Sequence, residues 1–259
     1  MRRRIESIHS IINRQTFITV ALAIVSTAVC RNQGWFAEFP LTLMGTAVIF
    51  PIVFSIGGAY KRREAALDDY GAIKAHGRAV YFATRDWFDD TDTELQDLGR
   101  DLLYDLLEGM RTMFEQPVSE MEHNEREVYA AFSNLSIFIN SLRDRGLPSG
   151  EASRCNQFLS KMMVSFEHIK HVYQYRTPMT LRAYSKLFIS VLPVLYGPYF
   201  AAISQEYSRG FEYVMPVLLT VILVSLDNIQ EHLENPFDQV GEDDLFINAE
   251  KFRDRLLAT

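Results

Sequence analysis

An uncharged run of 21 residues, at positions 39–59, constrains the fold of this chain more than any other feature. The run reads FPLTLMGTAVIFPIVFSIGGA and contains no Asp, Glu, Lys or Arg. A helix needs about 20 predominantly apolar residues to cross the roughly 30 Å hydrocarbon core of a bilayer. The run therefore predicts a transmembrane helix, and we favour this interpretation over a helix buried in a soluble core.

Three further apolar stretches occupy residues 16–30, 187–203 and 211–226. Each is weaker evidence for a transmembrane helix than residues 39–59. The stretch at residues 16–30 is long enough to cross a bilayer only if the side chain of Arg14 extends toward the surface, and the stretch at residues 211–226 contains Glu212. The short connectors RNQGWFAE and SQEYSRG join the four stretches in pairs. Since an apolar helix that enters a bilayer must return when its connector is short, we expect two membrane hairpins.

The basic residues predict the orientation of these hairpins. Arginines and lysines precede the first stretch, follow the second and precede the third, whereas the connectors contain only Arg31 and Arg209. Under the positive-inside rule, this pattern predicts an integral, multi-pass membrane protein with both termini in the cytoplasm. A cleavable signal peptide is the alternative for residues 16–30, because MRRR precedes an apolar run that ends in small residues. The second span follows so soon that we favour the hairpin.

The middle of the chain, at residues 60–175, has a composition typical of helices. It is rich in Leu, Ala, Glu and Arg and lacks an alternating strand pattern, so we expect a helical bundle into which the second span continues as a long helix. Three helices are predicted, one from about position 91 to Pro117, one at residues 125–145 and one at residues 151–175. The buried stripe expected on the first is Leu95, Leu98, Leu102, Leu106 and Met110, and that on the second is Val128, Phe132, Leu135, Phe138 and Leu142.

Composition and motifs argue against several classes of function. The formal net charge of −7, without a basic stripe, argues against nucleic-acid binding. Cys30 and Cys155 are far apart in the sequence, and we expect neither a disulfide nor a zinc ribbon. No Walker A loop, GxSxG, HExxH or CxxC pattern is present, so we expect no enzymatic activity. His168 and His171 could share a metal, but a solvated helix face explains them better.

An acidic segment, ENPFDQVGEDD at residues 234–244, directly follows the last apolar stretch. It concentrates carboxylate and carbonyl oxygens, which are the ligands that Ca²⁺ prefers. The other interpretation is a solvated acidic connector beside a juxtamembrane helix, and the residues taken alone favour it.

Three segments resemble the bestrophin family. EHLENPFDQVGEDDLFIN, at residues 231–248, resembles the bestrophin segment in which an Asn-Pro-Phe turn after the last transmembrane helix leads into an acidic stretch. FPLTLMGTAVIFPIVFSIGGAY, at residues 39–60, resembles the pore-lining second helix, and YRTPMTLRAYSKLF, at residues 175–188, resembles the Thr-Pro segment before the third helix. The likeness spans nearly the full chain, with the segments in the same order and spacing.

The resemblance implies an all-α fold with four transmembrane helices plus a cytosolic helical bundle, assembled as a homopentamer around one central pore. Phe39, Leu43 and Ala47 would form the hydrophobic neck of that pore, which would gate by dewetting, and Met179 would lie at a second, cytosolic constriction. Chloride would be the permeant ion, favoured by helix ends and aromatic edges rather than by fixed cations.

The sequence departs from the family pattern in three places. Leu43 and Ala47 are less aromatic than the usual neck, which implies a wider or less selective pore. KRREAA stands where the family usually has an Asp-Arg-Trp stretch, and the acidic loop is longer than the usual form. Animal members use that loop to bind Ca²⁺, so the resemblance makes Asn235, Asp243 and Asp244 candidate calcium ligands, and no other cofactor is expected.

The sequence thus predicts five regions. They are an N-terminal cytosolic helix (residues 1–15), transmembrane helices 1 and 2 (16–59), a cytosolic helical bundle (60–185), transmembrane helices 3 and 4 (186–227) and an acidic C-terminal cytosolic segment (228–259). The predicted function is an anion channel subunit for chloride or bicarbonate with a hydrophobic neck gate, whose partners are the lipid bilayer and other copies of the chain. A non-conducting membrane adaptor that docks a cytosolic partner through its helical bundle is the alternative.

Overall fold

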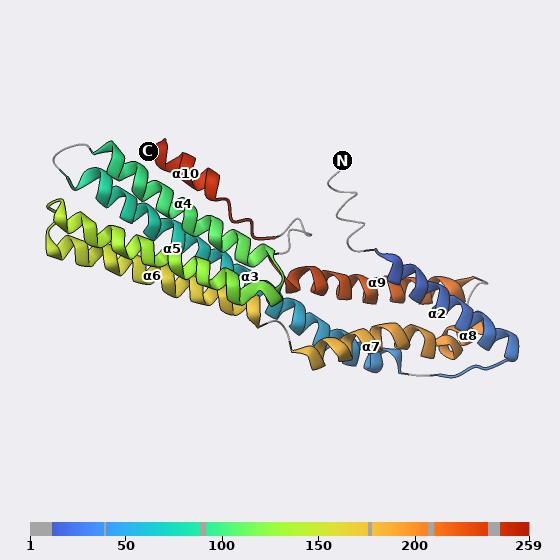
Figure 1. Cartoon of the computed structure of the whole chain (residues 1–259). Coiled ribbons are helices and arrows are strands. Elements are labelled where there is room, and N and C mark those ends of the chain that lie inside the picture. Colours follow the sequence, from blue (N-terminus) through green and yellow to red (C-terminus); the bar gives the residue numbers. More distant parts are fainter. Residues whose placement is uncertain are drawn as a thin grey trace. The chain divides into compact units, whose positions relative to one another are not determined.

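The chain folds into helices joined by short connections (Figure 1). The computed structural model describes residues 12–38, 40–88, 92–175, 178–206, 210–237 and 244–258, and no β-strand occurs among them. The helices are α2 (Arg14–Gln33), α3 (Leu41–Asp86), α4 (Thr93–Glu115), the short 3₁₀ helix η1 (Val118–Glu120), α5 (Met121–Asp144), α6 (Ser149–Gln174), α7 (Met179–Leu195), α8 (Gly197–Glu206), α9 (Phe211–Glu234) and α10 (Ala249–Leu257). The prediction of an all-α fold is confirmed.

Two compact units make up the chain. Unit 1 comprises Met1–Lys61 and Arg176–Asn235, and unit 2 comprises Arg62–Tyr175 and Pro236–Thr259. Helix α3 contributes its first part to unit 1 and the rest to unit 2. The long helix predicted to continue from the second apolar stretch is therefore confirmed, with a length of 46 residues.

Unit 1 contains the apolar helices. Helices α2, α3 and α9 are each long and apolar enough to cross a membrane, and a fourth span results if the bent helix pair that ends in α7 and continues in α8 counts as one. The predicted stretch at residues 187–203 is divided at Tyr196, between α7 and α8. The core of the unit lies where α3, α7, α8 and α9 meet, around Val48, Ile52, Ile189, Leu192, Tyr196, Phe200, Leu223 and Val224.

Helices α2 and α8 approach each other closely at Gly197. A Cβ atom built on Gly197 would lie 3.1 Å from the backbone carbonyl carbon of Ser26, so a larger residue would force the two helices apart. The hydroxyl of Ser26 donates a hydrogen bond to the carbonyl of Val194 at 2.7 Å. That carbonyl has no helical N–H partner four residues later, because Pro198 stands there. A side-chain hydroxyl thus replaces the hydrogen bond that proline removes.

Glu212, the acidic residue within the last apolar stretch, is fully buried in the first turn of α9. Its Oε1 accepts a hydrogen bond from Arg31 Nη1 at 2.5 Å, and its Oε2 accepts one from the backbone N–H of Gly210 at 2.7 Å. The carboxylate is therefore paired with a cation and hydrogen-bonded. Because the charge of Glu212 is paired in this way, it is compatible with α9 as a transmembrane helix.

Unit 2 is a bundle of amphipathic helices. The five residues predicted as the buried stripe of α5 are all buried, which confirms that prediction. The stripe predicted for α4 is wrong at Leu98, which is 48% exposed, and Leu102 is only partly buried, whereas Gly99 and Leu103 are buried. Gly99 takes the inward position because a Cβ atom there would lie 3.1 Å from the ring of Phe138 on α5. The small residue lets the two helices pack closely, and the larger leucine beside it faces outward.

The C-terminal segment belongs to unit 2. The ring of Phe237 stacks on that of Phe114 in α4, with 4.9 Å between centroids. Helix α10 begins at the capping residue Asn248 and buries Phe252 and Leu256 against the bundle. Buried side chains therefore anchor the described residues on both sides of the acidic loop, whose residues 238–243 lie outside the described part of the chain.

A partly buried cation links α5 and α6. Lys170 Nζ lies 2.8 Å from Glu125 Oε1 and 2.6 Å from Glu167 Oε2, and it donates a hydrogen bond to the Tyr129 hydroxyl at 2.8 Å. Burial lowers the pKa of Lys170, but the hydrogen bonds with the carboxylates and the tyrosine outweigh burial and raise this pKa above its usual value. The pKa of Glu167 is held below its usual value by the hydrogen bonds from Lys170 and Tyr129, although burial opposes them.

The two cysteines lie one in each unit. Cys30 in α2 and Cys155 in α6 are both free and buried, which confirms the prediction that they do not pair. Burial raises the pKa of the Cys155 thiol to about 11.

Candidate functional site

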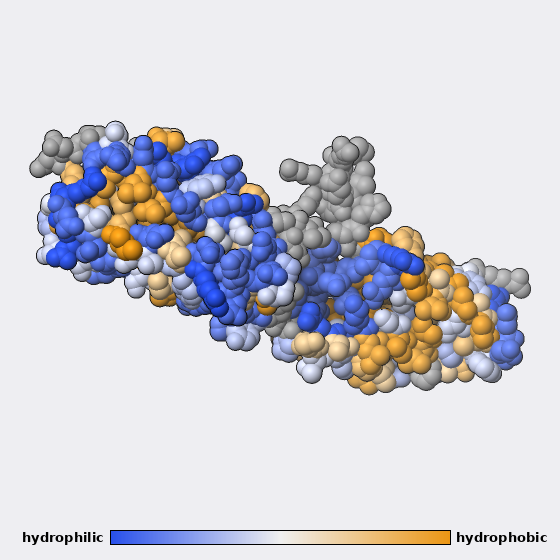
Figure 2. Space-filling view, in the orientation of Figure 1, coloured by the Kyte–Doolittle hydropathy of each residue, from blue (hydrophilic) through white to orange (hydrophobic). Residues whose placement is uncertain are grey.

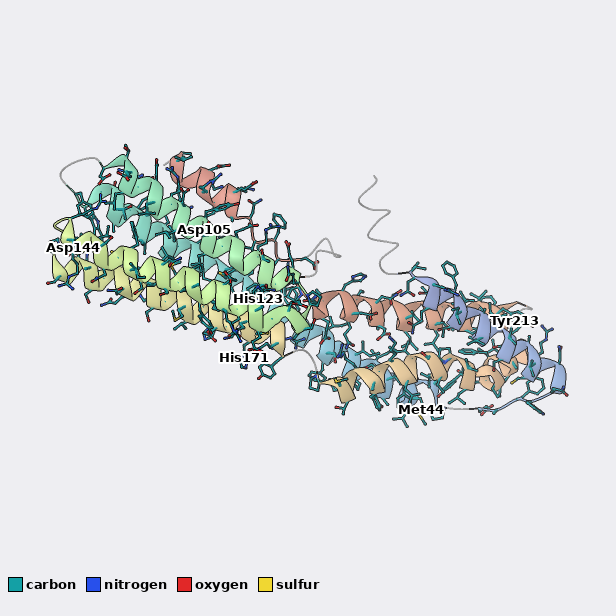
Figure 3. The ribbon with its side chains drawn as sticks, viewed as in Figure 1. Met44, Asp105, His123, Asp144, His171 and Tyr213 are labelled. Carbon is teal, nitrogen blue, oxygen red and sulfur yellow. The ribbon has the colours of Figure 1, made fainter. Side chains whose placement is uncertain are left out.

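The first part of α3 has two opposite faces. Val48 and Ile52 are buried in the core of unit 1. On the other side lies a line of exposed residues spaced by four, three and four positions, which keeps them on one face of a helix with 3.6 residues per turn. We call this set the exposed α3 face, and it consists of Leu43, Ala47, Phe50 and Phe54. Leu43 is 66% exposed, and the adjacent Met44 also projects away from the unit (Figure 3).

The exposed α3 face carries neither a charge nor a polar side-chain atom. Its two rings, those of Phe50 and Phe54, meet edge to face with 4.8 Å between centroids. The nearby hydroxyl of Thr46 donates a hydrogen bond to the carbonyl of Thr42 at 2.7 Å. Since aromatic rings have positively polarised edges, this face combines a surface that repels water with a weak attraction for negative charge.

A tyrosine of α7 supports the backbone of this face. Pro51 has no N–H with which to bond the carbonyl of Ala47, four residues earlier. The hydroxyl of Tyr184 donates a hydrogen bond to that carbonyl at 3.4 Å. The break that proline introduces into α3 is therefore tied to the neighbouring helix at the level of Ala47.

The structure places two of the three predicted neck residues on one face. Leu43 and Ala47 both belong to the exposed α3 face, whereas Phe39 lies outside the described residues. Met179 is the first residue of α7 and is 77% exposed. The neck and the constriction near Met179 stay predictions, because a pore needs several copies of the chain.

Among the described residues, no group of three His, Cys, Asp or Glu side chains could hold a metal ion. His168 Nδ1 lies 3.4 Å from Asp69 Oδ1, while the ring of His171 packs on that of Tyr175 with 4.5 Å between centroids. The two histidines thus contact different partners, which favours the solvated helix face.

The predicted calcium ligands are only partly described. Asp243 lies outside the described residues, and Asp244 is half-buried in unit 2. Asn235 ends α9 in unit 1, and its buried Oδ1 atom has no hydrogen-bond partner among the described residues. Such an oxygen is of the type that Ca²⁺ accepts, so calcium binding stays a prediction.

Sequence reasoning missed three residues of this site. Phe50 and Phe54 continue the line of Leu43 and Ala47 by one and two turns, and this spacing could have been read from the sequence. The contribution of Tyr184 could not, because its contact with Ala47 joins residues that are 137 positions apart.

The fold and this face together define an all-α protein with helices of membrane-spanning length, one of which exposes an uncharged stripe opposite its packed side. No protein-family model and no curated protein match the sequence.

Solved structures do match. A variant of a bacterial bestrophin homologue from Klebsiella pneumoniae superimposes with a TM-score of 0.79 at 15% sequence identity, over 94% of this chain and 97% of that chain. Another structure of the Klebsiella pneumoniae homologue gives a TM-score of 0.76 at 16% identity, over 94% and 96% of the two chains. The chain therefore has the fold of the bacterial bestrophin homologues, and the bestrophin resemblance seen in the sequence is confirmed for the fold.

Proposed function

We propose that the chain is the subunit of an anion channel in a membrane, assembled as a homopentamer with the exposed α3 face lining its pore. The observation that carries the proposal is that face itself, an uncharged stripe opposite the packed side of α3. Apolar surface left in water costs about 25 cal/mol per Å², so the stripe needs lipid or further copies of the chain to cover it. The fold shared with the bestrophin homologues favours further copies.

In such a pentamer, five copies of Phe39, Leu43 and Ala47 form an apolar neck, and Phe50 and Phe54 continue the exposed stripe further along α3. A narrow apolar ring expels water and conducts only when it widens, which makes it a gate. Aromatic edges favour chloride or bicarbonate over cations inside the ring. Met179 forms the second constriction, on the cytosolic side.

The apolar helices of unit 1 embed the protein in a bilayer with four spans and with both termini in the cytoplasm. This orientation rests on the arginines and lysines at the ends of the apolar stretches.

Asn235, Asp243 and Asp244 are proposed as calcium ligands. Chelation of Ca²⁺ should then reduce channel activity in the wild type and leave an Asp244→Asn variant unaffected.

Chloride flux from liposomes that contain the purified protein tests the channel. Ala47→Phe adds a ring to the proposed neck and should lower the flux at least about tenfold, whereas Leu43→Ala should raise it. Val25→Phe is the matched control, because it adds an aromatic ring to an exposed position of α2 and should leave flux unchanged.

Two outcomes would overturn conduction through this face, and a third would contradict the pentamer. One is flux that Ala47→Phe and Leu43→Ala leave at the wild-type level. The other is a wild type without flux whose particles are five-fold symmetric, which would instead favour a non-conducting adaptor. Particles without five-fold symmetry in detergent would contradict the pentamer.

A further inference from the structure

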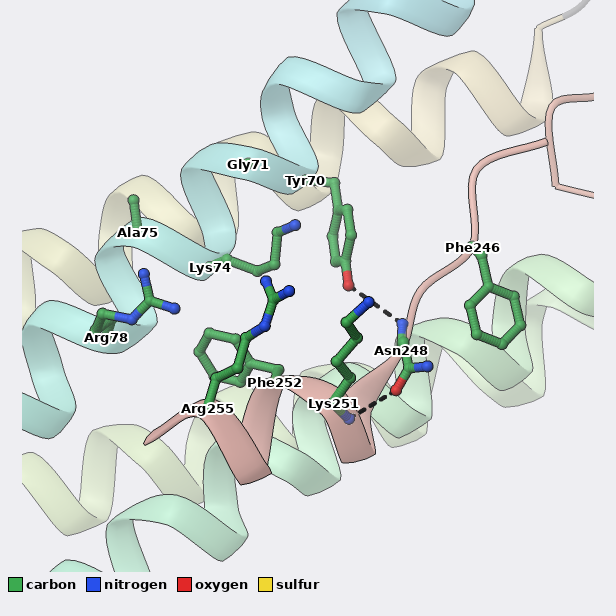
Figure 4. A pocket seen from close by; sticks show the side chains of 10 residues that line it. All are labelled: Tyr70, Gly71, Lys74, Ala75, Arg78, Phe246, Asn248, Lys251, Phe252 and Arg255. Carbon is green, nitrogen blue, oxygen red and sulfur yellow. Dashed lines mark hydrogen bonds between the residues drawn. The ribbon is translucent and has the colours of Figure 1, made fainter. Parts of the chain in front are cut away.

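A basic pocket in unit 2 has no place in the proposed channel function. It lies between α3 and α10 and has a volume of about 550 Å³ (Figure 4). The cations that line it are Lys74 and Arg78 from α3 and Lys251 and Arg255 from α10. The ten described residues that line the pocket include no carboxylate. In a chain with a net charge of −7, this is an unusual concentration of positive charge.

Two hydrogen bonds of Asn248 cap α10 and link it to α3. Asn248 Oδ1 accepts a hydrogen bond from the N–H of Lys251 at 2.7 Å and so caps α10. The N–H of the same asparagine donates a hydrogen bond to the hydroxyl of Tyr70 on α3 at 3.2 Å. Each pair of cations is spaced by four residues and therefore lies on one helix face. Figure 4 shows the two pairs directed into the space between α3 and α10.

The cations of the pocket repel one another. The pKa of Lys74 lies below its usual value, first because the side chain is partly buried and then because of the charges of Arg255, Arg78 and Lys251. Arg78 Nε is buried and has no hydrogen-bond partner among the described residues. A bound anion would offset the repulsion and supply an acceptor for this N–H.

The size and the walls of the pocket indicate the class of anion. A volume of this size suits a small molecule rather than a single halide ion. The rings of Tyr70 and Phe252 form apolar walls, and Lys74 Nζ lies 4.1 Å from the centroid of Tyr70. Such walls strengthen charge pairing, because they lower the local dielectric constant. A cluster of cations around one pocket favours an anion that carries several negative charges on more than one phosphate group.

We propose that the pocket between α3 and α10 binds a multiply phosphorylated anion, held by Lys74, Arg78, Lys251 and Arg255. The ligand is either a soluble polyphosphate or the phosphorylated headgroup of a lipid, since both present the same groups. The site is separate from the exposed α3 face, and binding does not depend on whether the protein conducts.

Calorimetric titration of the full chain in detergent tests the proposal, with inorganic triphosphate and inositol trisphosphate as probes. We expect one site per chain and binding of inorganic monophosphate at least about tenfold weaker than that of the better probe. Tighter binding of triphosphate would assign the site to a soluble ligand, and tighter binding of inositol trisphosphate would assign it to a lipid headgroup. Binding of neither probe overturns the proposal.

Two variants locate the binding. Lys74→Ala should weaken it at least about tenfold, whereas Lys161→Ala, which removes an exposed lysine of α6, should leave it unchanged. Gly71→Phe should abolish it by filling the pocket, because a Cβ atom on Gly71 meets no atom within 4 Å. Gly150→Phe on α6 is the matched control, since Gly150 is equally open. A Gly71→Phe protein that keeps its thermal stability and still binds the probe as the wild type does would overturn the proposal.

Discussion

Helix α2 of unit 1 and helix α5 of unit 2 are of similar length and have opposite patterns of burial. The buried residues of α2 are small or polar, namely Thr16, Thr19, Ala23, Thr27 and Cys30. Its large apolar side chains are exposed, among them Phe17, Ile18, Leu22 and Val25. In α5 the large apolar side chains are buried except for Ile137, and charged and other polar residues make up most of the outer face.

The difference shows which solvent each unit requires. In water, burial of large apolar side chains drives packing, and α5 follows this rule. Small buried residues that permit close helix contact, with large apolar ones outside, are typical of helices in lipid, and α2 follows that pattern. In Figure 2 hydrophobic residues gather where α2, α7 and α8 lie, whereas hydrophilic residues cover most of the surface drawn for unit 2.

Truncation of matched phenylalanines should give the largest effect. Phe166→Ala in unit 2 should lower the free energy of unfolding by about 3–5 kcal/mol, because its buried ring contacts those of Phe114, Tyr129 and Phe132. Phe17→Ala in unit 1 should cost less than about 1 kcal/mol in detergent, since Phe17 is 68% exposed. Chemical denaturation of both proteins measures the difference, and equal losses would break the comparison.

Arginine at exposed apolar positions tests the two environments directly. Leu22→Arg on α2 should reduce membrane insertion by about 2.5–3.5 kcal/mol, the cost of an arginine at the centre of a span. Ile137→Arg on α5 replaces a similarly exposed residue and should change stability by less than about 0.5 kcal/mol. The fraction of protein recovered in membranes is the measurement. A Leu22→Arg protein that inserts as well as the wild type would place the outer face of α2 in water.

A methyl group at the contact of α2 and α8 probes close packing within unit 1. Gly197→Ala should destabilise the detergent-solubilised protein by about 1–3 kcal/mol, because the new Cβ atom meets the backbone at Ser26. The same change at Gly57 of α3 should cost nothing, since a Cβ atom there meets no atom within 4 Å. Thermal unfolding of the two variants side by side checks this, and similar melting temperatures would show that α2 and α8 do not pack closely.

The smallest effect concerns the ion pairs of unit 2. The lowered pKa of Glu167 means that its contribution to stability is present above its usual pKa of 4.5 and is lost as the pH falls through the lower value of the folded state. Because Glu167 is partly exposed, Glu167→Gln should cost about 0.5 kcal/mol at pH 7 and nothing in strong acid. Glu122→Gln, in an exposed pair with Arg126, should have no measurable effect at either pH. A cost for Glu167→Gln that persists in acid would assign the effect to packing rather than to charge.

Periodicity predicted the helices and most of their buried faces. The stripe of α5 follows directly from apolar spacing, and the continuation of α3 follows from the absence of a strong breaker after position 60. Leu98 was misplaced because a glycine gives no hydrophobic signal, although Gly99 lies at the helix contact.

The partners of polar groups were beyond prediction. The hydrogen bond of Tyr184 with Ala47 and the ion pair of Arg31 with Glu212 join residues far apart in the sequence. The basic pocket likewise needs α10 to pack on α3, which no local pattern encodes. The spacing of four between Lys74 and Arg78, repeated by the two cations of α10, was the one signal available.

The single cysteine in each unit provides a natural pair of labels. A maleimide reacts with the thiolate, and burial raises the pKa of the Cys155 thiol to about 11, so this thiol is protonated and unreactive at pH 7. Cys30 is shielded by neighbouring helices in its own unit. Modification of either thiol therefore requires its helix to open. Mass spectrometry of the two cysteine-containing peptides over time would measure the rate at which each unit opens, in one sample of the wild-type protein.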